Sequence, residues 1–213
     1  MEGSRSTLIL AHGAGTHMDH PHMLRLTHIA LSAGLSVLRF LFPYRARGRS
    51  WPPDRKEVLL HAFADVLLAR DAFLDSNRVL LGGHSLGGRI AVDLVAHDPA
   101  GRDVSGVLLS SYPLHPAKPT AAERLAALSV LPCPIFLMQG GRDTFGKFAQ
   151  VRDLLLGRCA TDAFLEIPGG DHGWKTRKSD AMSAADVDHL LTSALARWLE
   201  ESDPKRSLRR ELT

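Results

Sequence analysis

Six short apolar runs alternate with longer segments of helical periodicity, and this alternation restricts the fold more than any other feature of the sequence. Most of the runs are continuously apolar, as in strands that are buried on both faces. Strands that alternate with helices predict a mostly parallel six-stranded sheet, an α/β architecture with helices on both faces. The expected strands are Thr7–Ala11, Leu35–Phe40, Arg78–Gly82, Gly106–Ser110, Pro134–Gln139 and Ala163–Ile167.

Two of the helices have recognisable starts. Asp54 and Glu57 have the spacing of a capping box and predict a helix that begins near Asp54. Ser183 and Asp186 have the same spacing and predict the start of the last helix. The expected core-facing residues are Leu59, Phe63, Val66, Leu67 and Leu74 in the first helix and Val187, Leu190, Leu191, Ala194 and Trp198 in the last.

Two segments are rich in proline, glycine and charge, which is typical of loops. They are Pro43 to Pro53 and Tyr112 to Thr120. Neither is long enough to hold a lid domain. We therefore expect an open site and no large cap domain.

The length of 213 residues fits one α/β domain, expected over residues 1–202 and followed by a basic tail at residues 203–213. Four of the 26 basic and two of the 23 acidic residues lie in that tail, so the rest of the chain carries 22 basic and 21 acidic residues. A nearly neutral body without a basic stripe interleaved with aromatic residues predicts no nucleic-acid partner.

The two cysteines, Cys133 and Cys159, form no CxxC pair and are expected to be small buried hydrophobes in a reducing compartment. The apolar run Leu8–Ala11 is too short for the core of a signal peptide. No apolar run is long enough to span a membrane. These features predict a cytoplasmic protein without a membrane partner.

The segment RVLLGGHSLGGRIA (Arg78–Ala91) carries the clearest chemical signal. It places the pattern G-x-S-x-G, with Ser85 at its centre, between an apolar strand and an alanine-rich helix, the context of a nucleophile elbow. Side chains two residues before or after the serine would collide in so tight a turn, which explains the glycines. Ser85 is therefore the predicted nucleophile; the alternative is a turn that only packs the helix on the strand.

A serine hydroxyl needs a base, and the base needs an orienting acid. In α/β folds that carry such an elbow, the three catalytic residues follow one another along the chain in the order serine, acid, histidine. Asp143 follows the strand Pro134–Gln139 and His172 follows the strand Ala163–Ile167, so both lie where open α/β sheets place their sites. The alternatives are a turn role for Asp143 and a loop role for His172.

Two other aspartates are weaker candidates for the acid. Asp171 adjoins His172 in the sequence, and neighbouring side chains usually diverge, so we expect it to hold the loop. Asp162 precedes its strand and would lie at the wrong end of the sheet.

The segment His12–Gly15 follows the first strand and is a candidate oxyanion-binding loop. A strand order of 2-1-3-4-5-6 would make the first and third strands neighbours and place this loop beside the elbow. The predicted donors are the backbone N–H groups of Leu86 and Ala14, with Gly15 as the alternative to Ala14.

Several other residues could line a site. The histidines His17, His20 and His22 suggest zinc, but no partner cysteine or HExxH helix accompanies them, so no metal and no cofactor is expected. His84 and His115 are expected to be structural or to line a pocket. Loop arginines could meet an acidic substrate group or be solvated; they are Arg45, Arg47 and Arg49. The expected apolar rim, the substrate-binding group, consists of Tyr44, Trp51, Tyr112, Leu114, Phe145 and Trp174.

With these motifs assembled, the chain resembles the α/β-hydrolases over nearly its whole length, and broadly the dienelactone-hydrolase-like branch. More narrowly, it is similar to the family of testis-expressed hydrolase-like proteins and a subunit of the NSL acetyltransferase complex. The segments that carry the resemblance are HGAGTHMDHPHM (His12–Met23), RFLFPYRARGRSWPPDR (Arg39–Arg55), GGHSLGGRIA (Gly82–Ala91), YPLHP (Tyr112–Pro116), QGGRDTFG (Gln139–Gly146) and GGDHGW (Gly169–Trp174).

The resemblance implies the α/β-hydrolase fold, without the two leading strands of larger relatives, and a serine hydrolase that needs no cofactor. The resemblance does not imply a substrate. A small carboxylic ester, thioester or lactone is expected in place of a peptide, because an amide leaving group is harder to expel and no extended peptide-binding domain is present. Some relatives carry lysine at the position of His84 and act within complexes, so a non-catalytic scaffold is the alternative, and a cofactor-free perhydrolase is a third option. A homodimer and a protein complex both stay open.

Overall fold

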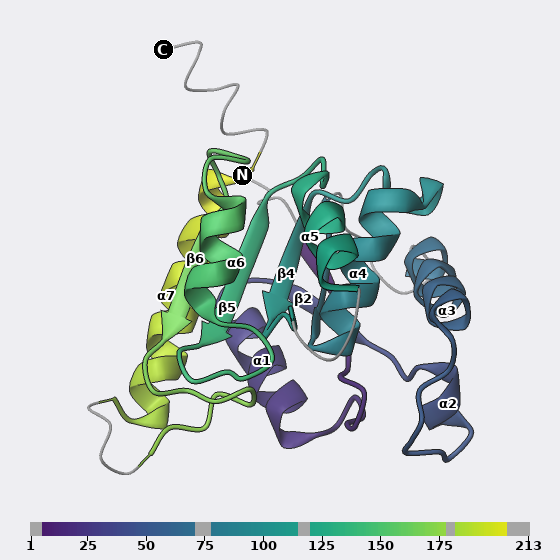
Figure 1. Ribbon diagram of the computed structural model, residues 1–213, viewed down its shortest axis with the longest axis horizontal. Coiled ribbons are helices and arrows are strands. Elements are labelled where there is room, and N and C mark those ends of the chain that lie inside the picture. Colours follow the sequence, from purple (N-terminus) through teal and green to yellow (C-terminus); the bar gives the residue numbers. More distant parts are fainter. Residues whose placement is uncertain (1–5, 71–77, 115–119, 178–181, 204–213) are drawn as a thin grey trace.

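The protein, described by a computed structural model over residues 6–70, 78–114, 120–177 and 182–203, folds around one sheet. Its six strands are all parallel and lie in the order β2-β1-β3-β4-β5-β6, which confirms the expected strand order. The carboxyl ends of all six strands therefore lie at one edge of the sheet, as the arrowheads in Figure 1 show for β5 and β6. The strands are β1 (Ser6–Ala11), β2 (Ser36–Arg39), β3 (Arg78–His84), β4 (Gly106–Ser110), β5 (Ile135–Gly140) and β6 (Ala163–Ile167).

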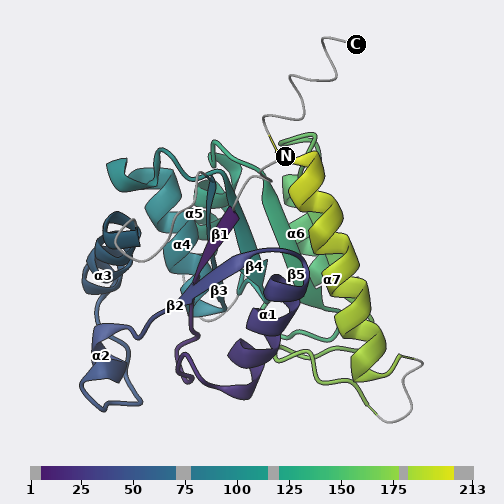
Figure 2. The same ribbon diagram turned by 180° about the vertical axis from the view of Figure 1, so that it is seen from behind.

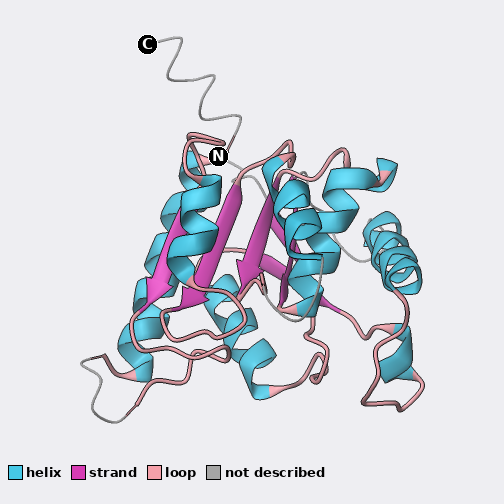
Figure 3. Cartoon of the chain, in the orientation of Figure 1, coloured by secondary structure: helices cyan, strands magenta, loops and turns pink. Residues whose placement is uncertain are grey.

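Helices cover both faces of the sheet (Figures 1 and 3). Helices α1 and α7 pack against one face, as the reverse view in Figure 2 shows, and α3 to α6 pack against the other. The helices are α1 (Pro21–Ser32), α2 (Pro43–Ala46), α3 (Lys56–Ala69), α4 (Leu86–His97), α5 (Thr120–Ser129), α6 (Phe148–Leu155) and α7 (Ala184–Glu201), with a short 3₁₀ helix η2 (Pro99–Gly101) after α4.

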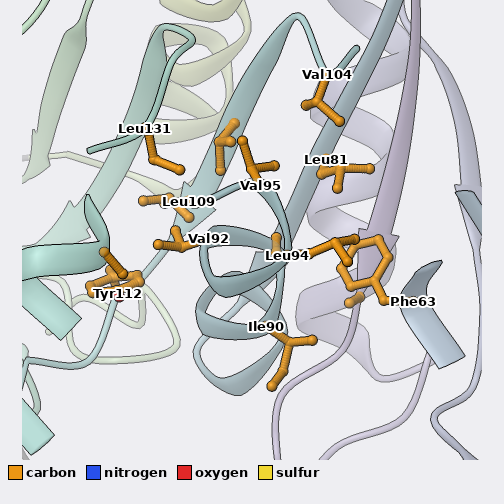
Figure 4. Close-up of a cluster of buried hydrophobic side chains, with 14 of the residues drawn as sticks. Phe63, Leu81, Ile90, Val92, Leu94, Val95, Val104, Leu109, Tyr112 and Leu131 are labelled. Carbon is orange, nitrogen blue, oxygen red and sulfur yellow. The ribbon is translucent and has the colours of Figure 1, made fainter. Parts of the chain in front are cut away.

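The alternation of side chains along each strand explains why the strands are apolar throughout. Leu8 and Leu10 of β1 point to the core beneath α1 and α7, whereas Ile9 and Ala11 point to the opposite core. All four are fully buried. Figure 4 shows part of the larger core, which contains side chains of β3, β4 and α4 together with Phe63 of α3.

The helix starts match the sequence only in part. Ser183 and Asp186 form the predicted capping box of α7. By contrast, α3 begins at Lys56 with Arg55 at its N-cap and no side-chain cap, so the capping box expected from Asp54 is wrong. The carboxylate of Asp54 instead binds the guanidinium groups of Arg47 and Arg49.

The predicted apolar faces are largely correct. In α7 the buried residues are Val187, Leu191, Leu195 and Trp198, so the prediction lacks Leu195. Leu190 and Ala194, which the sequence also predicted, are only partly buried. Leu74 lies outside the described residues.

The segment Pro43 to Pro53 is not entirely a loop, because it begins with α2. Pro43 stands at the first position of that helix, where its fixed φ angle favours a helical turn. Across the described part of the chain, no helix is long and apolar enough to cross a membrane.

Candidate active site

Ser85 lies in the sharp turn between β3 and α4. Its backbone angles are φ 51° and ψ −110°, a strained region for a residue with a side chain. A Cβ atom at Gly83 would lie 2.3 Å from the carbonyl carbon of Gly87, and one at Gly87 would lie 2.2 Å from the carbonyl oxygen of Ala11. The turn therefore requires glycine at both positions, as the G-x-S-x-G pattern predicted.

Asp143 and His172 meet at the carboxyl edge of the sheet, after β5 and β6. The Nδ1–H group of His172 donates to Oδ2 of Asp143 at 2.8 Å. The side-chain amide of Gln139 donates to the same oxygen at 2.9 Å, and the backbone N–H of Phe145 donates to Oδ1 at 2.8 Å. The carboxylate is almost completely buried and fixed at both oxygens, and the hydrogen bond leaves Nε2 of His172 for another partner.

The imidazole of His172 lies beside the elbow. Its ring centroid is 5.0 Å from that of His84, the residue immediately before Ser85, and 4.7 Å from the ring of Phe145. Among the described residues there is no hydrogen bond between the hydroxyl of Ser85 and the imidazole. The structure thus joins the predicted acid to the predicted base and brings the base to the neighbour of the predicted nucleophile.

A second group of buried polar side chains lies directly behind these residues. The ring of His22, near the start of α1, contacts the carbonyl oxygen of Gly173 at 3.1 Å through Nδ1 and the hydroxyl of Ser110 at 3.0 Å through Nε2. Nδ1 of His84 lies 3.2 Å from the same hydroxyl. In the sequence His22 stands in the zinc-like cluster with His17 and His20, and Ser110 belongs to no motif. Ser110 could have been identified from the sequence because it is a polar residue at the end of an otherwise apolar strand, next to the strand that leads to Ser85.

Both histidines of this group are neutral at physiological pH. Burial lowers the pKa of His22 from its ordinary 6.5 to about 4, against a smaller raising effect of its contact with Gly173. Burial likewise lowers the pKa of His84 far below its ordinary value, helped by the neighbouring His22 and His172.

The loop after β1 packs against the elbow. A Cβ atom at Gly13 would lie 3.0 Å from the ring of His84, so the loop and the elbow strand are in close contact. The hydroxyl of Tyr44 donates to the carbonyl oxygen of Ala14 at 2.8 Å, and Nε2 of His12 accepts from the backbone N–H of Phe42 at 3.1 Å. These contacts fix the loop from the side of α2.

The structure does not gather the expected apolar rim around one pocket. Tyr44, Tyr112 and Leu114 are buried in the larger core, and Figure 4 shows Tyr112 within it. The side chain of Trp174 is almost fully buried against His22, but this residue contributes to the wall of a cavity beside His172. Only Phe145, with 42% of its surface exposed and its ring against His172, and Trp51 lie at the surface.

A cavity of about 870 Å³ borders His172. Its wall includes the residues Arg25, Arg142 and Lys175, but not Ser85. Oδ1 of Asp171 accepts hydrogen bonds from two backbone N–H groups of the same loop, which agrees with its expected role in holding the loop.

The remaining candidates have local roles. His17 and His20 accept hydrogen bonds from backbone N–H groups within their own turn. No group of three metal-ligating side chains occurs within the described ranges. Asp162 accepts from the backbone N–H of Ile135 at the amino end of β5 and pairs with Arg158, far from the carboxyl edge as expected. His115 lies outside the described residues.

Similar folds occur among known hydrolases. The family model of the alpha/beta hydrolase domain matches residues 4–200. An alpha-beta serine hydrolase homologue from Coxiella burnetii is 19% identical, with a TM-score of 0.68 over 92% of this chain and 86% of that one. Est1E from Butyrivibrio proteoclasticus is 12% identical, with a TM-score of 0.66 over 94% and 90% of the two chains.

A monoacylglycerol lipase from Paleococcus ferrophilus is 16% identical, with a TM-score of 0.66 over 90% of this chain and 94% of that one. At such identities these structures establish a shared fold. Together with the family match over most of its length, they define the class: the chain belongs to the alpha/beta hydrolase family.

Proposed function

We propose that this protein is a serine hydrolase in which Ser85 is the nucleophile, His172 the general base and acid, and Asp143 the orienting carboxylate. The observation that carries the proposal is the hydrogen bond between the buried carboxylate of Asp143 and the partly exposed imidazole of His172, beside an elbow in which Ser85 has a strained backbone. A carboxylate that fixes one imidazole nitrogen leaves the other free to accept a proton from a hydroxyl group.

The reaction proceeds in two steps. The hydroxyl of Ser85 attacks the acyl carbon while Nε2 of His172 accepts its proton, and the imidazolium then donates that proton to the leaving oxygen or sulfur as its bond to the acyl carbon breaks. Water attacks the resulting acyl-enzyme in the second step, again with His172 as the base. The acid is released and Ser85 recovers its proton.

The negative charge of each tetrahedral intermediate would be held by the backbone N–H groups of Leu86 and Ala14. Leu86 is the first residue of α4, so its N–H group belongs to the unpaired amino end of a helix. Ala14 lies in the loop that packs against the elbow and is fixed through its carbonyl oxygen by Tyr44. Tyr44 is thus proposed to support the oxyanion loop, in place of a direct substrate contact.

The substrate we propose is a small carboxylic ester, thioester or lactone. The cavity beside His172 is large enough for a small molecule, and the leaving group must lie on the side of the residue that protonates it. Phe145 is the proposed substrate contact at the open side of His172. We also propose that the chain is related to the dienelactone-hydrolase-like branch and to the testis-expressed and NSL-subunit family. Members of that family differ in whether they catalyse reactions.

Labelling with a fluorophosphonate probe tests the proposal. We expect the wild-type protein to be labelled and to hydrolyse p-nitrophenyl esters, and Ser85→Ala to lose both activities. Ser193→Ala, in an exposed position of α7, is the matched control and should behave as wild type. A folded wild-type protein that neither reacts with the probe nor turns over any ester of the series would contradict the proposal and favour the non-catalytic scaffold.

A further inference from the structure

The two loops that carry the proposed base and nucleophile are connected through buried side chains outside the proposed triad. Gly173, which follows His172, contacts the ring of His22, and His84, which precedes Ser85, contacts the hydroxyl of Ser110. Since His22 also contacts Ser110, an unbroken chain of hydrogen bonds runs from one loop to the other. Each end of this chain is one residue away from a proposed reacting group.

The chemistry of the groups fixes the direction of every hydrogen bond in the chain. The carbonyl oxygen of Gly173 can only accept, so Nδ1 of His22 carries the proton and donates. Nε2 of the neutral ring then accepts from the hydroxyl of Ser110, and the oxygen of that hydroxyl accepts from the protonated Nδ1 of His84. One arrangement of protons satisfies all three contacts, which is the condition for a rigid buried network.

Ser110 also contacts the nucleophile turn through its backbone. Its carbonyl oxygen accepts from the backbone N–H of Ser85 at 2.9 Å. Ser110 is fully buried at the carboxyl end of β4, which pairs with β3 through the register of Ser110 with His84. The residue is therefore a fixed point of the sheet from which both the elbow and His22 are held.

On this geometry we propose that Ser110 and His22 are positioning residues, which together with His84 form a bridge that fixes the loop of His172 relative to Ser85. This inference rests on the proposed function. The ring of His22 is held in turn by Trp174, with ring centroids 4.6 Å apart in an edge-to-face arrangement. A directional network specifies the separation of the two loops more closely than apolar packing alone, because each bond restricts an angle as well as a distance.

The bridge can be tested by paired substitutions that keep or remove one donor. His22→Leu removes both hydrogen bonds of the ring, whereas His22→Asn retains an N–H group near the position of Nδ1 that can donate to Gly173. We expect His22→Leu and Ser110→Ala to lower kcat for a p-nitrophenyl ester by about tenfold to a hundredfold with little change in KM, since a small misplacement of reacting groups has effects of this size. His22→Asn should recover a substantial part of the loss.

A control on the same helix separates positioning from general damage to α1. His28 is exposed on α1, and His28→Leu should leave kcat and KM unchanged. Each variant is also assessed by its thermal unfolding midpoint and by the low-field proton resonance of the hydrogen bond between Asp143 and His172. We expect that resonance to persist in the bridge variants, because their defect lies between the two loops.

The outcomes distinguish the two proposals. If the wild type is active and folded His22→Leu and Ser110→Ala variants retain its kcat, the bridge is not a positioning device, although the triad stands. Equal losses in His22→Asn and His22→Leu would also overturn the bridge, because the retained donor would then have no effect. If Ser110→Ala does not fold, the two His22 variants decide the question. An inactive wild type would instead contradict the proposed function itself.

Discussion

Asp143 is the residue with the most completely specified surroundings in the candidate site. Its neighbour in space, Gln139, donates to Asp143 and to the carbonyl oxygen of Gly146 and accepts from the backbone N–H of Tyr112. Gln139, near the end of strand β5, therefore fixes the loop that carries Asp143. Since one oxygen of Asp143 accepts from both Gln139 and His172, that oxygen must remain an acceptor.

Substitution of Asp143 by asparagine tests this requirement. If the new amide group directs its nitrogen at His172, Nδ1–H of the imidazole loses its acceptor, and the tautomer with the proton on Nε2 is favoured instead. If it directs its oxygen there, the nitrogen lacks an acceptor elsewhere in the buried site. We expect Asp143→Asn to lower ester turnover by about a thousandfold or more, with KM little changed. Steady-state kinetics on a p-nitrophenyl ester measures this, and turnover close to that of the wild type would assign the acid elsewhere.

The strand–turn–helix unit of β3, Ser85 and α4 could be predicted in detail because its constraint is local. A tight turn needs glycine at fixed positions, and that need is visible in the sequence. The parallel pairing of the strands follows from the alternation of elements, and the positions of Asp143 and His172 follow from the strands before them. The sequence could suggest but not establish the direct contact between Asp143 and His172, because that contact depends on how two separate loops pack.

The burial of the aromatic residues could not be predicted. Tyr44 and Tyr112 lie in polar, proline-rich segments, which suggested exposure, yet tertiary packing places both rings in the core. Asp54 shows a similar limit, because two arginines that flank the same loop compete successfully with the helix for its carboxylate. The bridge of His22 and Ser110 joins residues that are distant in the sequence, and no local sequence pattern indicates their contact.

At the level of the element, α4 packs so closely on β1 that one added methyl group should destabilise the protein. Gly87→Ala would place a methyl group 2.2 Å from the carbonyl oxygen of Ala11, a backbone atom that cannot move without shifting β1. We expect a loss of about 3 kcal/mol or more in the free energy of unfolding, measured by urea denaturation. Gly15→Ala is the matched control, because a Cβ atom there meets nothing within 4 Å. Equal stability of the two variants would show that the elbow tolerates a wider turn.

At the scale of the whole molecule, the buried histidines link stability to pH. His22 and His84 are buried and have a lowered pKa in the folded state, so between about pH 4 and the ordinary 6.5 the unfolded chain binds more protons than the folded one. Their contribution to stability is therefore complete above about pH 6.5 and is lost as the pH falls toward 4. The groups that act on His22 include Gly173, which raises its pKa, and Arg25, His20 and His172, which lower it.

We accordingly expect the free energy of unfolding to fall steadily from pH 6.5 to pH 4, by an amount on the order of 3 kcal/mol from His22 alone. Urea denaturation at several pH values measures this slope. His22→Asn removes one of the titrating groups and should flatten it, whereas His28→Asn, at an exposed position of the same helix, should leave it unchanged. A slope that is the same in wild type and His22→Asn would assign the acid sensitivity to other groups.

Arg78 lies at the amino end of β3, at the edge of the sheet opposite to Ser85. It opens β3 in register with Ser6, the first residue of β1, and its guanidinium donates to the carbonyl oxygens of Leu199 and Ser202 and to the hydroxyl of Ser202, beside the end of α7. The same residue thus pairs with the first strand through its backbone and with the end of the last helix through its side chain. An affinity handle or a surface tether attached at this end of the sheet would leave the opposite edge, which carries Ser85, Asp143 and His172, turned outward.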